Sequence, residues 1–177
     1  MKDTDLAWLA GFWDGEGTIT LFTHSEKNGS RKIKTIVCVV NTDLGMISKA
    51  RKILEELGCG FHMTERRPAR RNHSTAWILQ TNRQENIIKF LTAVLPYLSG
   101  EKKERGEILL NYCLKRNSMV QRFPSKGSTP YSEEDWDALD AFNKMGFKRS
   151  NNRSSTTTRE ETQSVNSAAV AASESMI

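Results

Sequence analysis

The sequence predicts an α+β domain in which two β-hairpins alternate with three helices and form one four-stranded, mainly antiparallel sheet. Three observations lead to this prediction. Apolar residues recur at helical spacing near the N-terminus, segments of strand character then follow in pairs, and the order hairpin then helix occurs twice. The expected core has the order αββαββα, with additional helices toward the C-terminus.

The expected elements of the first half are a helix at 5–15, strands at 18–23 and 32–40, and a helix at 44–57. In the first helix Leu6, Leu9 and Trp13 share one face, and a glycine closes the segment. The strands are joined by the polar turn 27–30, which is typical of a hairpin. Asp43 offers a cap for the helix that follows, and Gly58 ends it.

The second half repeats this order with strands at 60–66 and 74–81. Asn82 is predicted to cap the third helix because Glu85 stands three residues later, and the helix is expected to end before Pro96. Two more helices are expected at about 102–116 and, capped by Ser132, up to residue 145. We expect one domain at 1–147 and a polar, mobile tail at 148–177, whose composition cannot offset its ordering entropy by burial.

The overall composition limits the class of protein. Of 177 residues, 37% are hydrophobic, which is enough for one core, and Lys and Arg outnumber Asp and Glu by 26 to 21. This excess favours a polyanionic partner only if it clusters on one surface. The three cysteines form no CxxC pair, so a zinc site is not expected and they are interpreted as small buried residues. No secretory signal or membrane-crossing run is found, which predicts an intracellular protein without a membrane partner.

The most informative stretch is residues 9–17, which reads LAGFWDGEG. Ala7, Gly11 and Gly15 are four residues apart and therefore form a bare stripe on one helix face. Each glycine inside a helix costs roughly 1 kcal/mol relative to alanine, and close packing against another helix would offset that cost. If the stripe packs against its own copy in a second chain, the twofold axis brings two helix ends together.

Two acids stand at the end of this stripe. Asp14 and Glu16 lie at the C-terminus of the helix, where the backbone already carries partial negative charge and acids are disfavoured. A divalent cation would reverse this penalty, and hard oxygen ligands suit Mg²⁺. The sequence therefore predicts a cation site at the helix end, close to the expected dimer axis.

The nonapeptide at 9–17 resembles the signature of the LAGLIDADG homing endonucleases, and the order of helices and strands extends this resemblance to about residue 116. Single-copy members of that family are homodimers, and no second copy occurs here. The resemblance implies Mg²⁺-dependent hydrolysis of both strands of a long, pseudo-palindromic double-stranded DNA site. Mn²⁺ or Ca²⁺ are other divalent cations that such sites accept.

The resemblance also implies roles for individual residues. Glu16 matches the family's metal-binding acid, which is more often aspartate, and the carbonyl of Gly15 is the second expected metal contact. Asp14 matches a residue that holds the helix end at the dimer interface. Asn41 resembles a polar position that orders water. Either Lys102 or Lys103 resembles the active-site lysine, and the choice is open because the preceding turn contains one additional residue.

A two-stranded ribbon fits the major groove, so the outward faces of both hairpins are expected to be polar and to contact DNA. Strand parity decides which residues these are, and an error of one residue would exchange the two faces. The expected DNA-binding residues are Thr18, Thr20, Phe22, His24, Lys32, Lys34, His62, Thr64, Arg66, Arg70, Arg71, Thr75 and Trp77.

Two other functions remain open on the same scaffold. A maturase would bind the intron RNA that encodes it, and a DNA-binding regulator would have kept the fold and lost the cleavage chemistry. The retained Glu16 argues against a wholly inactive protein. The sequence does not separate the cytoplasm of an archaeon or bacterium from an organelle matrix such as that of a chloroplast or mitochondrion.

Overall fold

The computed structural model describes residues 1–67, 74–122 and 130–145. The chain divides into two units, 1–139 and 140–177. The elements of the first unit are α1 (Asp3–Glu16), β1 (Gly17–Ser25), β2 (Arg31–Asn41), α2 (Leu44–Glu56), β3 (His62–Arg66), β4 (Ala76–Thr81), α3 (Gln84–Val94), the 3₁₀ turn η1 (Leu95–Tyr97) and α4 (Gly100–Arg122). A further helix occupies 133–145, and its residues 133–139 belong to the first unit.

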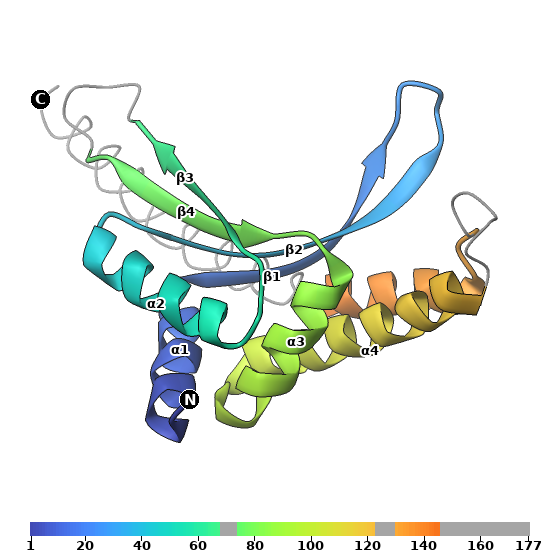
Figure 1. The fold of residues 1–177 in the computed structure, drawn as a ribbon. Helices are drawn as coiled ribbons and strands as arrows, with labels where there is room; N and C mark the ends of the chain where they lie inside the picture. The colour runs from blue at the N-terminus through green and yellow to red at the C-terminus, as the bar shows by residue number, and fades with distance from the viewer. Residues whose placement is uncertain (68–73, 123–129, 146–177) are drawn as a thin grey trace, which may run out of the picture. The chain divides into compact units, whose positions relative to one another are not determined.

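The four strands form one sheet in the order β1-β2-β4-β3, and every neighbouring pair is antiparallel (Figure 1). This confirms the α+β class with the αββαββα core and additional helices after it. β4 pairs with β2 only from Val37 to Asn41. The outer half of β2 therefore pairs with β1 alone, and the β1–β2 hairpin extends from the sheet as a two-stranded arm.

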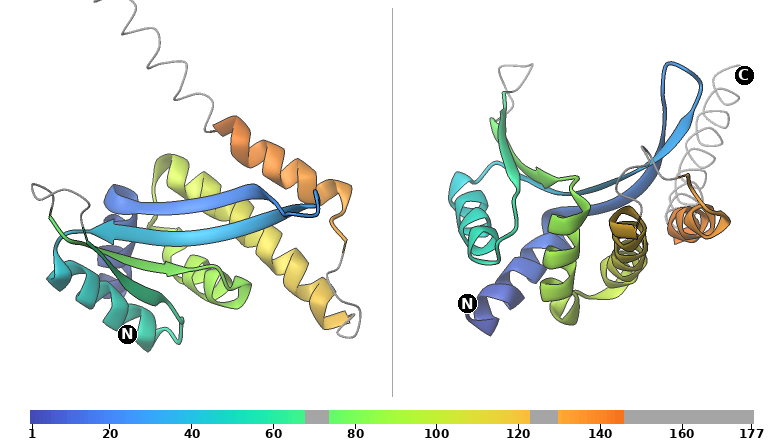
Figure 2. Two further views of the ribbon diagram at one scale, coloured as in Figure 1. Left: turned by 90° about the horizontal axis from the view of Figure 1, so that it is seen from above. Right: turned by 45° about the vertical axis from the view of Figure 1, so that its right-hand side comes forward.

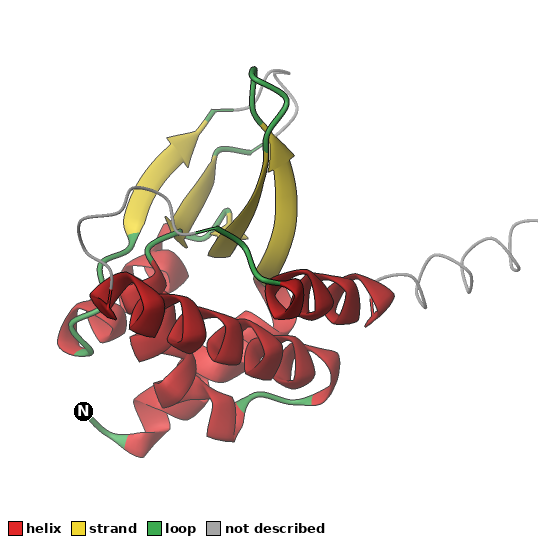
Figure 3. Cartoon of the chain, turned by 90° about the vertical axis from the view of Figure 1, so that its right-hand side faces the viewer, coloured by secondary structure: helices red, strands yellow, loops and turns green. Residues whose placement is uncertain are grey.

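The helices of this unit cover one face of the sheet and leave the other face open (Figure 3). Strand residues that point toward the helices are buried, among them Ile19, Leu21, Val37 and Val39. α3 and α4 lie side by side beneath the sheet, as two views show (Figures 1 and 2). Because side chains alternate along a strand, each strand supplies this core with every second residue and leaves the others on the open face.

The helix boundaries of α1 and α2 differ from the predicted ones by one or two residues, and α3 and α4 differ as well. Arg83, not Asn82, is the N-cap of α3, and its side chain makes no capping hydrogen bond. β4 ends at Thr81, as predicted, and the hydroxyl of this buried residue accepts a 3.4 Å hydrogen bond from the Arg83 backbone. The helix therefore begins one residue later than predicted. α4 continues to Arg122, beyond the predicted end at about residue 116. Lys115 and Arg116, near the predicted end, bind residues of the segment 130–135, which sequence alone cannot place.

Within the described part of the chain, no helix combines the length and apolar character that crossing a bilayer requires. The predicted tail at 148–177 lies outside the described residues, as do Arg70 and Arg71. The domain boundary at residue 147 therefore remains a prediction.

Candidate active site and nucleic-acid interface

The junction between α1 and β1 is fixed by the buried indole of Trp13. Its ring lies 4.8 Å from the Phe90 ring and 5.9 Å from the Phe61 ring, measured between centroids. A Cβ atom on Gly17 would lie 2.3 Å from Cδ1 of Trp13, a distance that real structures do not show. Only glycine fits at this position, so the chain leaves the helix and enters the strand at a rigid corner immediately after Glu16.

The carboxylate of Asp14 ties the end of α1 to the start of α4. Its Oδ2 accepts hydrogen bonds from the hydroxyl of Ser99 at 2.7 Å and from the Ser99 backbone at 3.1 Å. Gly100 follows with φ +52°, a left-handed conformation that favours glycine. Asp14 therefore holds the helix end within its own chain. Its Oδ1 is buried without a hydrogen-bond partner among the residues that the structure describes.

Of the two candidate lysines, the structure brings Lys102 to the end of α1. Its Nζ donates hydrogen bonds to the main-chain oxygen of Trp13 at 2.6 Å and of Asp14 at 2.7 Å. Lys103 is exposed on the next position of α4. A positive charge at the C-terminus of a helix is stabilising, because the last carbonyl groups carry partial negative charge.

Glu16 is the last residue of α1, and both Glu16 and Gly15 are exposed. No ion pair to Glu16 occurs among the described residues. Those residues also contain no group of three or more His, Cys, Asp or Glu side chains that could hold a metal ion. An exposed carboxylate beside helix-end carbonyl groups suits a hard cation, but the described part of one chain offers too few acidic ligands to enclose it.

Asn41 lies at the same end of the sheet as Glu16. Gly17 pairs with Val39, so Asn41 is two residues beyond the start of β1. Its side-chain oxygen accepts a 2.8 Å hydrogen bond from the backbone of Asp43, whose carboxylate caps α2. The oxygen of the amide is thus used in a local turn, while its nitrogen has no hydrogen bond to any described residue.

The small-residue stripe of α1 faces outward. Ala7, Gly11 and Gly15 are all exposed, and a Cβ atom added at Gly11 or Gly15 would meet nothing within 4 Å. The opposite side of the helix is buried in the core through Leu9 and Trp13. The bare face predicted from the sequence is therefore available to another molecule.

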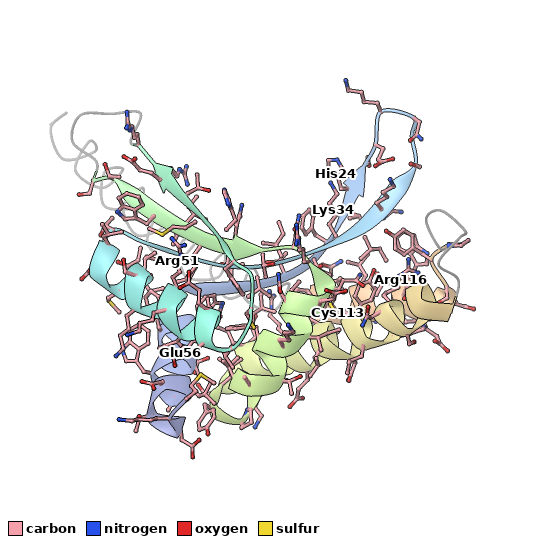
Figure 4. All side chains as sticks on the ribbon, in the orientation of Figure 1. His24, Lys34, Arg51, Glu56, Cys113 and Arg116 are labelled. Atoms are coloured by element: carbon pink, nitrogen blue, oxygen red, sulfur yellow. The ribbon has the colours of Figure 1, made fainter. Side chains whose placement is uncertain are left out.

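The register places most of the predicted DNA-binding residues on the open face of the sheet. His24 pairs with Lys32 and Phe22 with Lys34, and Figure 4 shows His24 and Lys34 on the side of the hairpin away from the helices. Lys32 also forms a 2.7 Å ion pair with Glu26. The predicted residues on the open face are Thr18, Thr20, Phe22, His24, Lys32, Lys34, His62, Thr64 and Arg66.

Trp77 is placed differently from the prediction. It pairs with Asn41 and shares its parity with the buried Leu79, so it belongs to the helix-facing set of β4, and Thr75 precedes the strand. The open-face positions of β4 are instead Ala76, Ile78 and Gln80, because Leu79 is buried against the helices and fixes the parity.

The expectation that the open face is polar throughout is wrong at its centre. Ile36, Cys38 and Val40 on β2 and Ile78 on β4 point to the open side. Cys59 and Cys113 are buried as predicted, whereas Cys38 is half-buried on this face. The uninterrupted apolar run 36–40 could have indicated this apolar centre. A strand that is apolar on both faces is expected to make contacts on its second face as well.

Sequence reasoning also missed two amide side chains near the arm. Asn82 and Gln84 line a hollow of about 400 Å³ together with Phe22, His24 and Lys34. Asn82 follows β4 and Gln84 is the first residue of α3, and nothing in their local pattern indicates that the chain returns to the hairpin there. The hollow joins them to the cationic part of the open face.

Comparison with known proteins concerns the family and the fold. A family model described as LAGLIDADG-like domain matches residues 3–94. The structure of the group I intron-encoded homing endonuclease I-CeuI complexed with DNA is similar at TM-score 0.54 and 14% identity, over 80% of this chain and 67% of that one. The archaeal intron-encoded homing endonuclease I-Vdi141I complexed with DNA is similar at TM-score 0.50 and 14% identity, over 83% and 99%.

I-SmaMI bound to its uncleaved DNA target in the presence of calcium ions is similar at TM-score 0.51 and 16% identity, over 76% of this chain and 42% of that one. No curated protein sequence matches. At these identities the structural matches show the fold, whereas the family model spans more than half of the 177 residues. The chain belongs to the family of proteins with a LAGLIDADG-like domain.

Proposed function

We propose that this chain is a site-specific, metal-dependent homing endonuclease that cuts both strands of double-stranded DNA as a homodimer. The observation that carries the proposal is the position of Glu16. It is an exposed carboxylate at a rigid helix end, next to Lys102 and at one end of an open sheet face with cationic side chains. The carboxylate of Glu16, the ammonium group of Lys102 and the open face of the sheet thus lie at one end of the fold.

The open face is the proposed DNA-binding surface. A curved antiparallel ribbon enters the major groove, where lysine, arginine and threonine reach base edges and phosphates. Lys34, His24 and Arg66 are exposed on this face. The structural relatives I-CeuI, I-Vdi141I and I-SmaMI were each solved with DNA, which supports this assignment.

The homodimer is proposed from the exposed stripe of Ala7, Gly11 and Gly15. Backbones of two helices approach closely only where side chains are small, and here the space above both glycines is empty. A second chain packed on this face would bring its own Glu16 to the first. The pair of carboxylates would then supply the acidic ligands that the described part of one chain lacks.

Glu16 and the carbonyl group of Gly15 are the proposed ligands of Mg²⁺, with Mn²⁺ or Ca²⁺ as alternatives. A divalent cation held there would supply Lewis-acid chemistry, lowering the pKa of water and polarising a phosphoryl oxygen. Lys102 would offset negative charge that develops on the phosphate. The Asn41 amide nitrogen would donate to a water molecule or a phosphate oxygen.

The test is incubation of the purified chain with Mg²⁺ and a plasmid that carries a site selected from a randomised pseudo-palindromic library. Specific linearisation is expected with wild-type protein and is expected to disappear with Glu16→Gln. Specific binding without cutting would refute the nuclease and favour a regulator. Preferential binding of structured intron RNA over the duplex would favour a maturase.

A further inference from the structure

The open face of the sheet has an apolar centre with polar surroundings. Val40 pairs with Ile78 across the β2–β4 ladder, and Ile36 and Cys38 continue the same face along β2. Val40 is 36% exposed. A contiguous apolar group on an otherwise polar surface is typical of a contact site and costs free energy while it faces water.

This apolar group has a defined place relative to Glu16. Along β2 the open-face residues run from Lys32 and Lys34, on the arm, to Val40, beside the start of β1. Because a strand rises about 3.3 Å per residue, Ile36 and Val40 are about 13 Å apart, close to the rise of four base pairs. The apolar residues would therefore face the base pairs nearer to the cleavage point.

Lysine, arginine and histidine side chains lie on two sides of this group. His24 and Lys34 lie on the arm, and His62 and Arg66 lie on β3. The major groove has the complementary arrangement, with phosphates along its margins and base edges on its floor. The basic side chains would therefore contact phosphates at the margins of the groove. The apolar residues between them would contact the base edges on its floor.

Only one of the four bases presents an apolar group in the major groove, namely the 5-methyl group of thymine. The exposed edges of guanine and cytosine carry strong acceptors and donors. Pressed against isoleucine and valine, these polar atoms would lose water without gaining a partner. Aliphatic side chains at these positions therefore select for thymine and against G·C pairs.

We infer that Ile36, Val40 and Ile78 are specificity-determining residues, and that each half of the target carries A·T pairs with thymine methyl groups directed at them. These pairs occupy the roughly four positions next to the cleavage point. Farther out, Lys34 and His24 make polar contacts and the preference changes. This inference rests on the proposed DNA endonuclease function and adds the base preference of its substrate.

The experiment begins with binding selection from a duplex library with randomised half-sites, using wild-type protein in Ca²⁺. In the best selected duplex, each inner thymine is then replaced by deoxyuridine, which removes the methyl group and leaves base pairing unchanged. The affinity is expected to fall about fourfold for each methyl group that contacts Ile36, Val40 or Ile78. The same replacement at outer positions serves as the control and is expected to change affinity little.

Protein variants test whether Ile36 and Ile78 are the side chains that contact the methyl groups. Ile78→Thr and Ile36→Thr keep β-branched residues in the strands but replace apolar contact with a hydroxyl group. In these variants the penalty for deoxyuridine is expected to vanish at the facing position only, which a double-mutant cycle measures. Leu114→Gln is the matched control, since Leu114 is an aliphatic residue of α4 with 48% exposure.

Three results would overturn the inference, and they have different consequences. Specific DNA binding without a thymine preference at inner positions, or with no deoxyuridine penalty, removes the inference and leaves the endonuclease proposal intact. If the loss of affinity on deoxyuridine replacement persists in both threonine variants, residues other than Ile36 and Ile78 contact the methyl groups. Absence of any DNA binding removes the proposed function as well.

Discussion

The ammonium group of Lys102 lies 2.7 Å from the main-chain oxygen of Asp14, so a side chain from α4 completes the last turn of α1. Asp14 in turn binds Ser99 through its carboxylate. In both contacts the hydrogen-bond donor belongs to Ser99, which precedes α4, or to Lys102 of α4, and the acceptor lies at the end of α1. They hold the helix end, and with it Glu16, at a fixed place although no metal ligand set exists within the described part of one chain.

Replacing Lys102 by methionine is expected to have two separable effects. Loss of the helix-end charge and its hydrogen bonds should lower the free energy of unfolding by about 1–2 kcal/mol. Under conditions where the variant is still folded, single-turnover cleavage should fall by a factor of at least about 100. Lys103→Met, on an exposed neighbour, should change neither quantity. Equal cleavage by the two variants would assign Lys102 a structural role only.

Glu16→Gln is expected to abolish cleavage while leaving DNA affinity within about twofold of wild type. The glutamine has the same size and removes only the charge, and no ion pair of the described residues depends on it. Binding is measured by titration of a labelled duplex and cutting by gel analysis of the plasmid. Undiminished cutting by this variant would remove Glu16 from the active site.

Gly11→Leu is expected to abolish self-association without unfolding the chain. A side chain at this position meets nothing within 4 Å in the single chain, and leucine is a better helix former than glycine. The thermal midpoint of the isolated chain should therefore stay the same or rise. Sedimentation velocity measures the association, with Ser48→Leu on the exposed face of α2 as the control. A normal Gly11→Leu dimer would contradict the packing of α1 against its copy.

The three cysteines are expected to differ in reactivity, and of the three only Cys38 lies on the open face. Burial raises the pKa of Cys59 to about 11 and that of Cys113 to about 12, so at pH 8 both thiols are protonated and unreactive. Burial raises the pKa of Cys38 as well, but this thiol is only half-buried. Iodoacetamide at pH 8 should therefore modify Cys38 first.

Bound duplex DNA should protect Cys38 from this modification, because the thiol lies in the centre of the proposed contact surface. The modified residue is identified by peptide mass spectrometry with and without a selected duplex. Raising the pH toward 11 should increase the reactivity of Cys59 before that of Cys113, following their pKa values. Cys38 modified at the same rate in the complex would place DNA elsewhere.

The buried ion pair between Arg116 and Asp135 is expected to stabilise the attachment of the segment after α4. Nη1 of Arg116 lies 3.4 Å from Oδ2 of Asp135, which is fully buried. Asp135→Ala leaves a buried cation without its carboxylate and should cost about 3 kcal/mol in the free energy of unfolding. Glu55→Ala, which breaks the exposed pair with Arg51, should cost less than about 1 kcal/mol in the same urea titration.

Much of the fold could be predicted from local pattern. The alternation at 18–23 gave the correct open face for β1, because Ile19 and Leu21 are buried and the residues between them are not. Trp77 could not be placed in the same way, since the segment 76–79 is apolar throughout and its parity depends on pairing with β2. The cap of α3 was misplaced by one residue, because the Thr81 hydroxyl accepts a hydrogen bond from the Arg83 backbone and the capping pattern of Asn82 with Glu85 does not report that contact.

The candidate site was predicted in part. The stripe of Ala7, Gly11 and Gly15 follows from helical periodicity alone, and its exposure agrees with that interpretation. The choice between Lys102 and Lys103 required the turn at Ser99 and Gly100, whose left-handed conformation sets the phase of α4. Asp14 and Ser99 are far apart in the chain, so no local sequence pattern predicts the contact between them.

The central claim is that two chains act together on one duplex. The most direct measurement is the molar mass of the complex between the full chain and a selected pseudo-palindromic duplex in Ca²⁺, determined by sedimentation equilibrium. We predict two chains per duplex, and cleavage of both strands when Mg²⁺ replaces Ca²⁺. A complex with one chain per duplex that still cuts both strands would contradict it.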